Sequence, residues 1–275
     1  MSVCGHKDTK SRVQCQIYLS IAEAKYLRLP FKIGIIRKNR IFVETKREAP
    51  MKTALLTFNP IQENTYVLWD ETLEAVVVDA GNSSDRENAA IDAFIAEHGL
   101  RPVLAINTHG HFDHTLGVCH LKERYGIPFA LSAQDRFLLE NAQTSGSIFG
   151  VRVGEMPAID IDLDETPEIR FGHTVLRVIP TPGHTPGHVA FHEPQAGLLF
   201  TGDTLFRESI GRTDLPGGDY SWIMRSILDK LLPLGDATRV HPGHGPETTL
   251  GHESLYNPFI VEVLNGEVGG ISNEK

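Results

Sequence analysis

Residues 109–114 of this chain, with the sequence HGHFDH, place three histidines and one aspartate within six positions. Imidazole nitrogens and carboxylate oxygens are ligands for zinc and for other divalent transition metals. Alternate residues of an extended segment point to the same side, so His109 and His111 are predicted to converge on one ion while Asp113 and His114 face a neighbouring ion. This density of ligands predicts a metal site with two ions.

Four ligands cannot complete the coordination of two ions, so further histidines or carboxylates are expected elsewhere in the chain. Three more segments offer such groups beside glycine at the ends of predicted strands: TPGHTPGH at 181–188, TGDT at 201–204 and HPGHGP at 241–246. Their proline and glycine residues favour rigid turns. The candidates that they supply are His184, Asp203 and His244.

Short strands and helices must position these loops. Residues 54–58, 65–69 and 75–79 are β-branched and apolar with turn residues between them, which predicts three strands with an antiparallel start. Ser84-Asp85 predicts the beginning of a helix that closes at Gly99, and 102–107 predicts a buried strand. Residues 108–114 are then predicted to be a loop between this strand and a helix over 115–125, in a position where chemistry is commonly found.

The pattern continues through the second half of the chain. Further strands are predicted at 129–131, near 169, and at 175–179, 189–191, 198–200 and 238–240, with helices at 133–141 and near 220–230, and an irregular stretch extends to about 164. Strands and interspersed helices recur in the same order in both halves. The predicted fold class is α/β, a single four-layer αββα sandwich with two packed sheets and helices outside.

The complete set of motifs resembles the metallo-β-lactamase superfamily over residues 51–250. The matching segments are THGHFDH, PGHTPGH, TGD and GHG. The resemblance implies one metal on His109, His111 and His184, a second on Asp113, His114 and His244, and Asp203 bridging both. Because these residues suffice for two ions, His188 and His241 are predicted to contact the ligands and not the metals, and Asp79 could orient a ligand imidazole.

Within the superfamily, the GRTD segment at 211–214 and the TLGHE segment at 249–253 resemble the short bacterial glyoxalase II-like enzymes, which are hydroxyacylglutathione hydrolases. The resemblance implies hydrolysis of a small-molecule thioester, such as a glutathione conjugate, by a hydroxide shared between two Zn²⁺ ions; iron or manganese are alternatives. Asp113 is predicted to orient the hydroxide or receive its proton. Arg212 is predicted to meet a substrate carboxylate, with an ion pair to Asp214 as the alternative. Long glyoxalase II enzymes carry a further C-terminal region for glutathione, which is not seen after His244.

Charge and composition limit the remaining classes. The net charge is −9, and residues 1–50 carry 11 Lys and Arg against 4 Asp and Glu, so the rest of the chain is acidic. An acidic body disfavours nucleic acid as a partner. No apolar stretch is long enough to cross a membrane. Three cysteines without paired spacing favour a reducing compartment, so a cytoplasmic enzyme is expected, and the oligomeric state stays open.

The predicted domain boundary lies at Met51. Residues 1–50 contain no motif or clear periodicity, whereas Met51 directly precedes the first predicted strand. We predict that 1–50 form a basic extension outside the fold and that 51–275 form the hydrolase domain. An organelle-targeting role for the extension is the alternative, although several acidic residues disfavour a transit peptide.

Two other functions compete with thioester hydrolysis. Persulfide dioxygenases with one iron also carry a GRTD segment, but the complete second set of ligands, His114 with His244 in a GHG context, favours two metals. A non-catalytic metal-binding module is opposed by the same complete set. A serine hydrolase is disfavoured because the chain contains no GxSxG segment.

Overall fold

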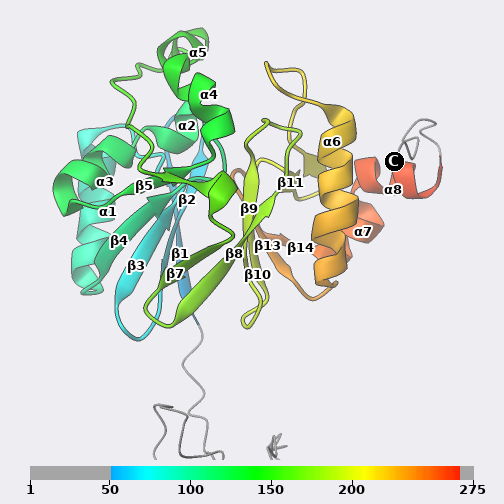
Figure 1. Cartoon of the computed structure of the whole chain (residues 1–275), viewed down its shortest axis with the longest axis horizontal. Helices are drawn as coiled ribbons and strands as arrows, with labels where there is room; N and C mark the ends of the chain where they lie inside the picture. Colours follow the sequence, from blue (N-terminus) through cyan, green and yellow to red (C-terminus); the bar gives the residue numbers. More distant parts are fainter. Residues whose placement is uncertain (1–50, 267–275) are drawn as a thin grey trace, which may run out of the picture. The chain divides into compact units, whose positions relative to one another are not determined.

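The computed structural model describes residues 51–266, in which strands and helices alternate around two sheets (Figure 1). The first sheet contains β1 (Lys52–Phe58), β2 (Glu63–Trp69), β3 (Glu74–Val78), β4 (Arg101–Ile106), β5 (Phe129–Leu131) and β6 (Ile161–Asp162). The second contains β7 (Glu168–Phe171), β8 (Thr174–Pro180), β9 (Val189–Glu193), β10 (Leu198–Gly202), β13 (Arg239–Pro242) and β14 (Thr248–Thr249). A small ribbon of β11 (Leu205–Phe206) and β12 (Ser209–Ile210) follows β10. The predicted extension at 1–50 lies outside the described residues.

Both sheets combine antiparallel hairpins with parallel pairs. The strand order is β1-β2-β3-β4-β5-β6 in the first sheet and β14-β13-β10-β9-β8-β7 in the second. As predicted, β1, β2 and β3 pair antiparallel, whereas β3, β4, β5 and β6 pair parallel. In the second sheet, β10 and β13 are parallel. Parallel strands bring their carboxyl ends to one edge of a sheet, and ligands bind at this edge in open α/β sheets.

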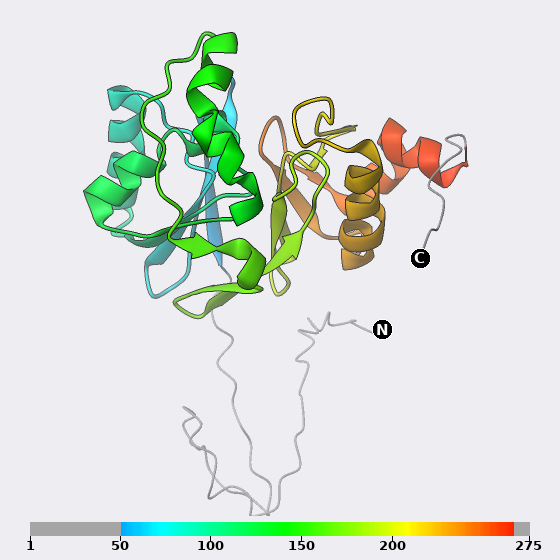
Figure 2. The same cartoon turned by 45° about the horizontal axis from the view of Figure 1, so that its top comes forward.

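Helices cover the outer faces of the two sheets (Figures 1 and 2). They are α1 (Asp85–Glu97), α2 (Phe112–Thr115), α3 (Val118–Tyr125), α4 (Arg136–Glu140), α5 (Ala142–Ile148), α6 (Tyr220–Arg225), α7 (Leu250–Tyr256) and α8 (Pro258–Leu264), with shorter 3₁₀ turns η1 (Ala133–Asp135), η2 (Leu163–Glu165) and η4 (Leu232–Leu234) and a π-helical segment η3 (Ser226–Leu231). Among residues 51–266, no helix has the length and apolar character needed to cross a bilayer.

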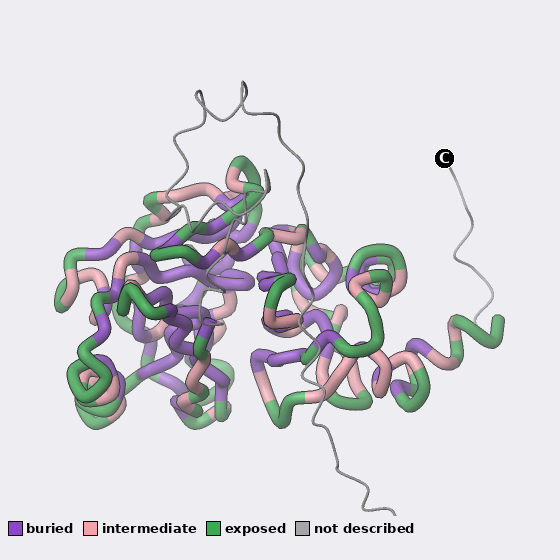
Figure 3. The backbone as a smooth tube through the Cα atoms, turned by 90° about the horizontal axis from the view of Figure 1, so that it is seen from below, coloured by how far each residue is buried: buried purple, intermediate pink, exposed green. Residues whose placement is uncertain are grey.

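Three apolar layers hold the four structural layers together. The central layer joins the facing sides of the sheets, with Leu68 and Ile106 from one sheet and Phe191 and Phe200 from the other. Two outer layers lie between each sheet and its own helices. Figure 3 shows the result, with buried residues concentrated in the interior and exposed residues on the outer turns. The predicted four-layer αββα sandwich is confirmed.

Three local predictions were wrong in detail. The 115–125 helix is divided into α2 and α3 at Leu116 and Gly117, and α2 begins at Phe112, inside the predicted loop. The stretch from 142 to about 164 that was predicted to be irregular contains α5 and the short strand β6. The helix from Ser84 is confirmed: the Ser84 side chain accepts a hydrogen bond from the Glu87 N–H, and α1 is followed by Gly99 with a φ of +61°.

A buried carboxylate joins the two sheets at the end opposite the parallel strand ends. Asp70, after β2, accepts hydrogen bonds from the Thr72 N–H and from the His173 N–H and Thr174 hydroxyl of the β7–β8 hairpin, at 2.9, 2.6 and 3.1 Å. Gly172 is required there because a Cβ atom would lie 2.4 Å from the Asp70 carboxylate.

Replacing Asp70 with alanine is expected to destabilise the fold, because it leaves these donors without their acceptor. The expected loss is about 1–3 kcal/mol in the free energy of unfolding. Urea denaturation of the two proteins measures it. Glu71→Ala, at the adjacent exposed position, is the control, and an equal effect of both changes would contradict the assigned role of Asp70.

Candidate metal centre

The seven residues predicted as ligands meet at the carboxyl ends of the parallel strands. His109 and His111 follow β4, Asp203 follows β10 and His244 follows β13. The remaining three are Asp113, His114 and His184. Potential ligand atoms of all seven fall into overlapping groups in which the atoms lie within 4.8 Å of one another. Both sheets therefore contribute to one centre.

Three imidazoles form one side of this centre, which we call the histidine half-site: His109, His111 and His184. The Nε2 atom of His184 lies 2.9 Å from the Nδ1 atom of His111. The ring of His109 lies 4.8 Å from that of His111 and 4.9 Å from that of His184. Three imidazoles at this spacing can each present one ring nitrogen to a single ion.

The other side, which we call the mixed half-site, contains Asp113, His114 and His244. The Asp113 Oδ2 atom lies 3.3 Å from Nε2 of His244 and 3.7 Å from Nε2 of His114. Asp113 and His114 belong to α2, so they reach this position through a helical turn and not along an extended loop as predicted.

Asp203 lies between the half-sites. Its Oδ1 atom is 3.4 Å from Nε2 of His114, and its Oδ2 atom is 3.6 Å from Nε2 of His184 and 3.7 Å from Nε2 of His244. One carboxylate therefore faces both groups of ligands. This is the placement that a bridging ligand requires.

The centre contains buried polar atoms without hydrogen-bond partners among the described residues. They include Nε2 of His109, Nε2 of His114 and Oδ1 of Asp203, whose side chains form one close group. A buried polar atom without a partner costs free energy, and a bound cation is one way of satisfying it. The donor set and these atoms fit divalent metal ions.

The protonation states also suit metal binding. Burial, together with His184, lowers the pKa of His111 to about 3, and burial lowers the pKa of His109 well below its usual range. Burial favours a protonated Asp113, but the neighbouring His114 and His244 outweigh it and lower the pKa of this carboxyl. His109 and His111 therefore offer neutral imidazoles, and Asp113 offers an ionised carboxylate.

Hydrogen bonds to Nδ1 orient two of the candidate ligand imidazoles, His109 and His184. The Thr108 hydroxyl donates to Asp79 at 2.7 Å, so its oxygen accepts from Nδ1 of His109 at 3.0 Å. The backbone oxygen of Arg212 accepts from Nδ1 of His184 at 2.8 Å. Because Nδ1 carries the proton, Nε2 of both imidazoles keeps the lone pair that could bind an ion, which is the usual arrangement around metal-bound histidine. The predicted role of Asp79 as an orienting residue agrees with these contacts.

The two other histidines of the ligand loops, His188 and His241, have different contacts. Nε2 of His188 accepts the Asp203 N–H at 3.1 Å, in agreement with the prediction that His188 contacts a ligand. His241 instead stacks on Phe200 and meets Tyr66 edge-on. The same prediction for His241 is therefore wrong, because its ring is part of the packing behind the loop.

Arg212 reaches the centre through its backbone. Its guanidinium, half exposed, forms two hydrogen bonds of 2.8 Å with Asp214, the alternative considered from the sequence. Gly211 lies so close to Asp203 that a Cβ atom on the glycine would be 1.8 Å from the backbone oxygen of Asp203. In this structure, the GRTD segment thus orients His184 and packs beside Asp203.

Sequence reasoning missed three buried polar residues around the centre. The Oε1 atom of Glu63 lies 3.9 Å from Nδ1 of His114, and its Oε2 atom lies 2.8 Å from the Thr65 hydroxyl. Asp135 and Asn64 contact the ligand loops. Their hydrogen-bond partners lie up to 181 positions away in the sequence. The only local sign of these contacts is the glycine content of the ligand loops, since glycine lets another side chain approach the backbone closely.

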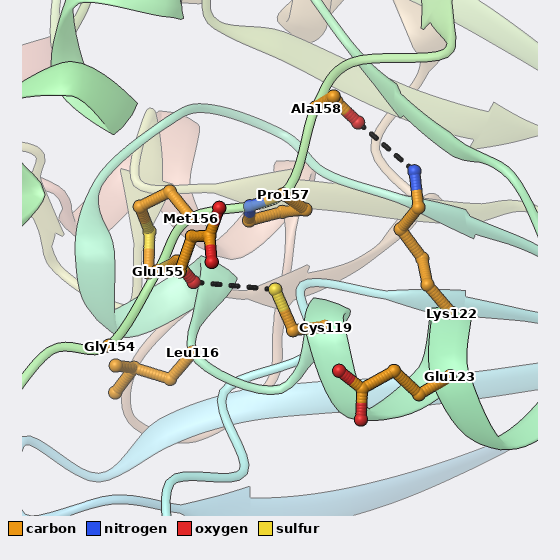
Figure 4. A pocket seen from close by; sticks show the side chains of 9 residues that line it. All are labelled: Leu116, Cys119, Lys122, Glu123, Gly154, Glu155, Met156, Pro157 and Ala158. Atoms are coloured by element: carbon orange, nitrogen blue, oxygen red, sulfur yellow. Dashed lines mark hydrogen bonds between the residues drawn. The ribbon is translucent and has the colours of Figure 1, made fainter.

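Cys119 is excluded as a nucleophile of this centre. It lines a separate cavity of about 500 Å³ with Leu116, Lys122, Glu155 and other residues, none of which is a predicted ligand (Figure 4). Its thiol donates to the Glu155 backbone oxygen at 3.3 Å, and burial raises its pKa. A protonated thiol is a poor nucleophile.

An αββα sandwich with a histidine- and aspartate-rich centre at the ends of its strands defines this chain as a metal-dependent hydrolase. It belongs to the metallo-β-lactamase superfamily, whose sequence profile matches residues 58–244.

Two relatives illustrate the similarity at the sequence level. The chain is 34% identical to hydroxyacylglutathione hydrolase GloC of Haemophilus influenzae, over 76% of this chain and 98% of the relative. It is 37% identical to the probable metallo-hydrolase YqgX of Bacillus subtilis, over 76% and 98% of the two chains.

Solved structures share the fold. The B3 metallo-β-lactamase BLEG-1 superposes with a TM-score of 0.71 at 36% identity, over 76% of this chain and 99% of its own. A di-iron-bound form of TTHA1623 gives 0.67 at 38% identity, over 75% and 99%. ETHE1 from Myxococcus xanthus gives 0.62 at 26% identity, over 79% and 92%.

Proposed function

We propose that this chain hydrolyses a small-molecule thioester of the S-D-lactoylglutathione type with two divalent ions, of which zinc is the principal candidate. The observation that carries the proposal is the pair of half-sites facing a shared Asp203. The similarity to GloC supports the thioester, and the di-iron form of TTHA1623 supports iron as the alternative metal.

His109, His111 and His184 would hold one ion, and Asp113, His114 and His244 the other, with Asp203 between them. Bound ions of this kind lower the pKa of water toward ~7 and polarise a carbonyl group. The pKa of the Asp113 carboxyl is lowered by His114 and His244, and we propose that this carboxylate accepts a proton from the attacking water. The acyl–sulfur bond breaks, a hydroxyl group adds to the acyl carbon, and the products are a carboxylic acid and a thiol.

The experiment measures metal content by elemental analysis, together with hydrolysis of S-D-lactoylglutathione and oxygen uptake with glutathione persulfide. We expect about two ions per chain and thioester cleavage. One iron per chain with persulfide-dependent oxygen uptake would replace the proposal with a persulfide dioxygenase, the function suggested by the GRTD segment. Two bound ions without turnover of either compound would favour a binding module.

The Arg212 guanidinium is proposed to exchange Asp214 for a substrate carboxylate. Arg212→Ala is then expected to raise KM about 10-fold, equivalent to roughly 1.4 kcal/mol. Metal content should not change, since His184 contacts only the backbone oxygen of residue 212. Arg207→Ala, at a nearby exposed position, is the matched control. An unchanged KM would limit Arg212 to its backbone role.

A further inference from the structure

Asp135 is a buried carboxylate that joins the two loops of the histidine half-site. It accepts hydrogen bonds from the Gly110 N–H at 3.0 Å, the Thr185 hydroxyl at 2.7 Å and the Gly187 N–H at 2.7 Å. Gly110 lies between His109 and His111, and Thr185 follows His184. One side chain thus fixes both segments that carry these three imidazoles.

The glycines of these loops permit this contact. A Cβ atom at Gly110 would lie 2.9 Å from the Asp135 backbone oxygen, and one at Gly187 would lie 2.8 Å from its Oδ1 atom. Both distances are shorter than Cβ atoms normally tolerate. The glycine between the first two histidines is therefore explained by the approach of Asp135.

Asn64, at the start of β2, has the corresponding position beside the mixed half-site. Its side-chain Nδ2 donates to the backbone oxygens of Pro242 and Gly245 at 3.1 and 2.8 Å, and its backbone N–H donates to the Gly243 oxygen at 2.8 Å. These acceptors lie on both sides of His244. Asn64 is buried and belongs to the first sheet, whereas His244 follows a strand of the second.

We infer that Asp135 and Asn64 are positioning residues that act separately, Asp135 on the histidine half-site and Asn64 on the mixed half-site. The inference rests on the proposed function in so far as each half-site holds an ion. Neither residue is a predicted ligand. Each acts by holding a ligand loop at the distance that binding requires, and such outer partners affect metal affinity by roughly 10–100-fold.

The chemistry of the two contacts provides a matched pair of isosteric variants. The Asp135 carboxylate faces only donors, so Asp135→Asn turns one of its acceptors into an N–H₂ group that faces donors. The Asn64 amide faces two carbonyl oxygens through Nδ2, so Asn64→Asp places a carboxylate oxygen against these carbonyls. Each variant preserves volume and reverses one set of hydrogen bonds.

The test isolates each half-site by removing one ligand of the other. His244→Ala leaves the histidine half-site intact, and His184→Ala leaves the mixed half-site intact. Competition with a chromophoric chelator then measures the Kd of Zn²⁺ in each background. Asp135→Asn is expected to raise Kd by about 10–100-fold in the His244→Ala background and by less than about 2-fold in the His184→Ala background. Asn64→Asp is expected to give the reverse pattern.

A second measurement uses Co²⁺ at one equivalent in the otherwise unchanged chain. Asp135→Asn should retain the absorption spectrum of the mixed half-site, and Asn64→Asp that of the histidine half-site. The inference would be overturned by identical Co²⁺ spectra of the two variants or by equal losses of Zn²⁺ affinity in both backgrounds. It would also be overturned if the sole effect were a lower unfolding temperature of the metal-free protein.

The parent chain distinguishes this inference from the proposed function. If it binds two ions but does not cleave thioesters, the substrate assignment fails and the positioning roles can still be measured. If it binds no ion, both fail together.

Discussion

Removal of divalent ions is expected to abolish hydrolysis, with a loss of at least about 1,000-fold, because a single electrostatic contact to the reacting oxygen already contributes about 10²–10³-fold. The described residues of the centre are histidines and aspartates, and Cys119 lies in a different cavity. Without ions, the side chains at this centre can donate hydrogen bonds and transfer protons, but they supply no Lewis acid to activate water and polarise the carbonyl group. Dialysis against dipicolinate, followed by rate measurements before and after addition of Zn²⁺, checks this prediction.

The same treatment should lower the unfolding temperature, since an ion at 100 times its Kd contributes about 2.7 kcal/mol to stability. Dialysis without the chelator is the control. Activity that survives in protein shown by elemental analysis to be metal-free would contradict the proposed function.

Gly243→Ala is expected to cause a large loss of activity, although Gly243 is not a candidate ligand. A Cβ atom at this position would lie 2.4 Å from Oδ1 of Asp203 and 2.7 Å from Cε1 of His114. The methyl group would displace a shared carboxylate and an imidazole together. We expect a loss of activity of about 100-fold, at the upper end of the effect of removing an outer partner of a metal ligand, with a reduced metal content.

Gly245→Ala is the control from the same loop. Gly245 has a φ of +75°, and a Cβ atom there would meet no atom within 4 Å. This variant should lose about 1 kcal/mol of stability through backbone strain and keep its metals. Elemental analysis and thermal unfolding distinguish the two variants. Equal metal content in both would contradict the steric argument for Gly243.

The fold was predictable from the sequence because its strands are regular and its turns carry strong signals. The first three strands, the helix that begins after Ser84 and the sandwich class are all present. The missed helix α5 contains Gly146, which disfavours a helix in isolation. In the structure, this glycine lets the helix approach Val153, whose Cγ2 would lie 2.3 Å from a Cβ atom. The contact with Val153 therefore explains why a glycine that disfavours a helix is found inside α5.

The candidate ligands were predictable for a different reason. Each one stands beside glycine, proline or another ligand, in a loop or helical turn that follows a strand, so local sequence is sufficient to find them. Asp135 and Asn64 have no such local pattern, and their roles depend on partners that the fold brings together. Arg212 also could not be assigned fully from local sequence. Its charge predicted a role for the side chain, whereas in the structure its backbone oxygen contacts His184.

The centre is divided between two stretches of chain. The first sheet comes entirely from residues 52–162 and the second from residues 168–249, so a short segment around η2 connects the two along the chain. His109, His111, Asp113 and His114 come from the first stretch, and His184, Asp203 and His244 from the second. The chain connection keeps the ligands of the two stretches close together, which gives them a high effective concentration for binding the same pair of ions. Cleavage of that segment would make metal affinity vary with protein concentration, and bound ions would act as a removable cross-link between the halves.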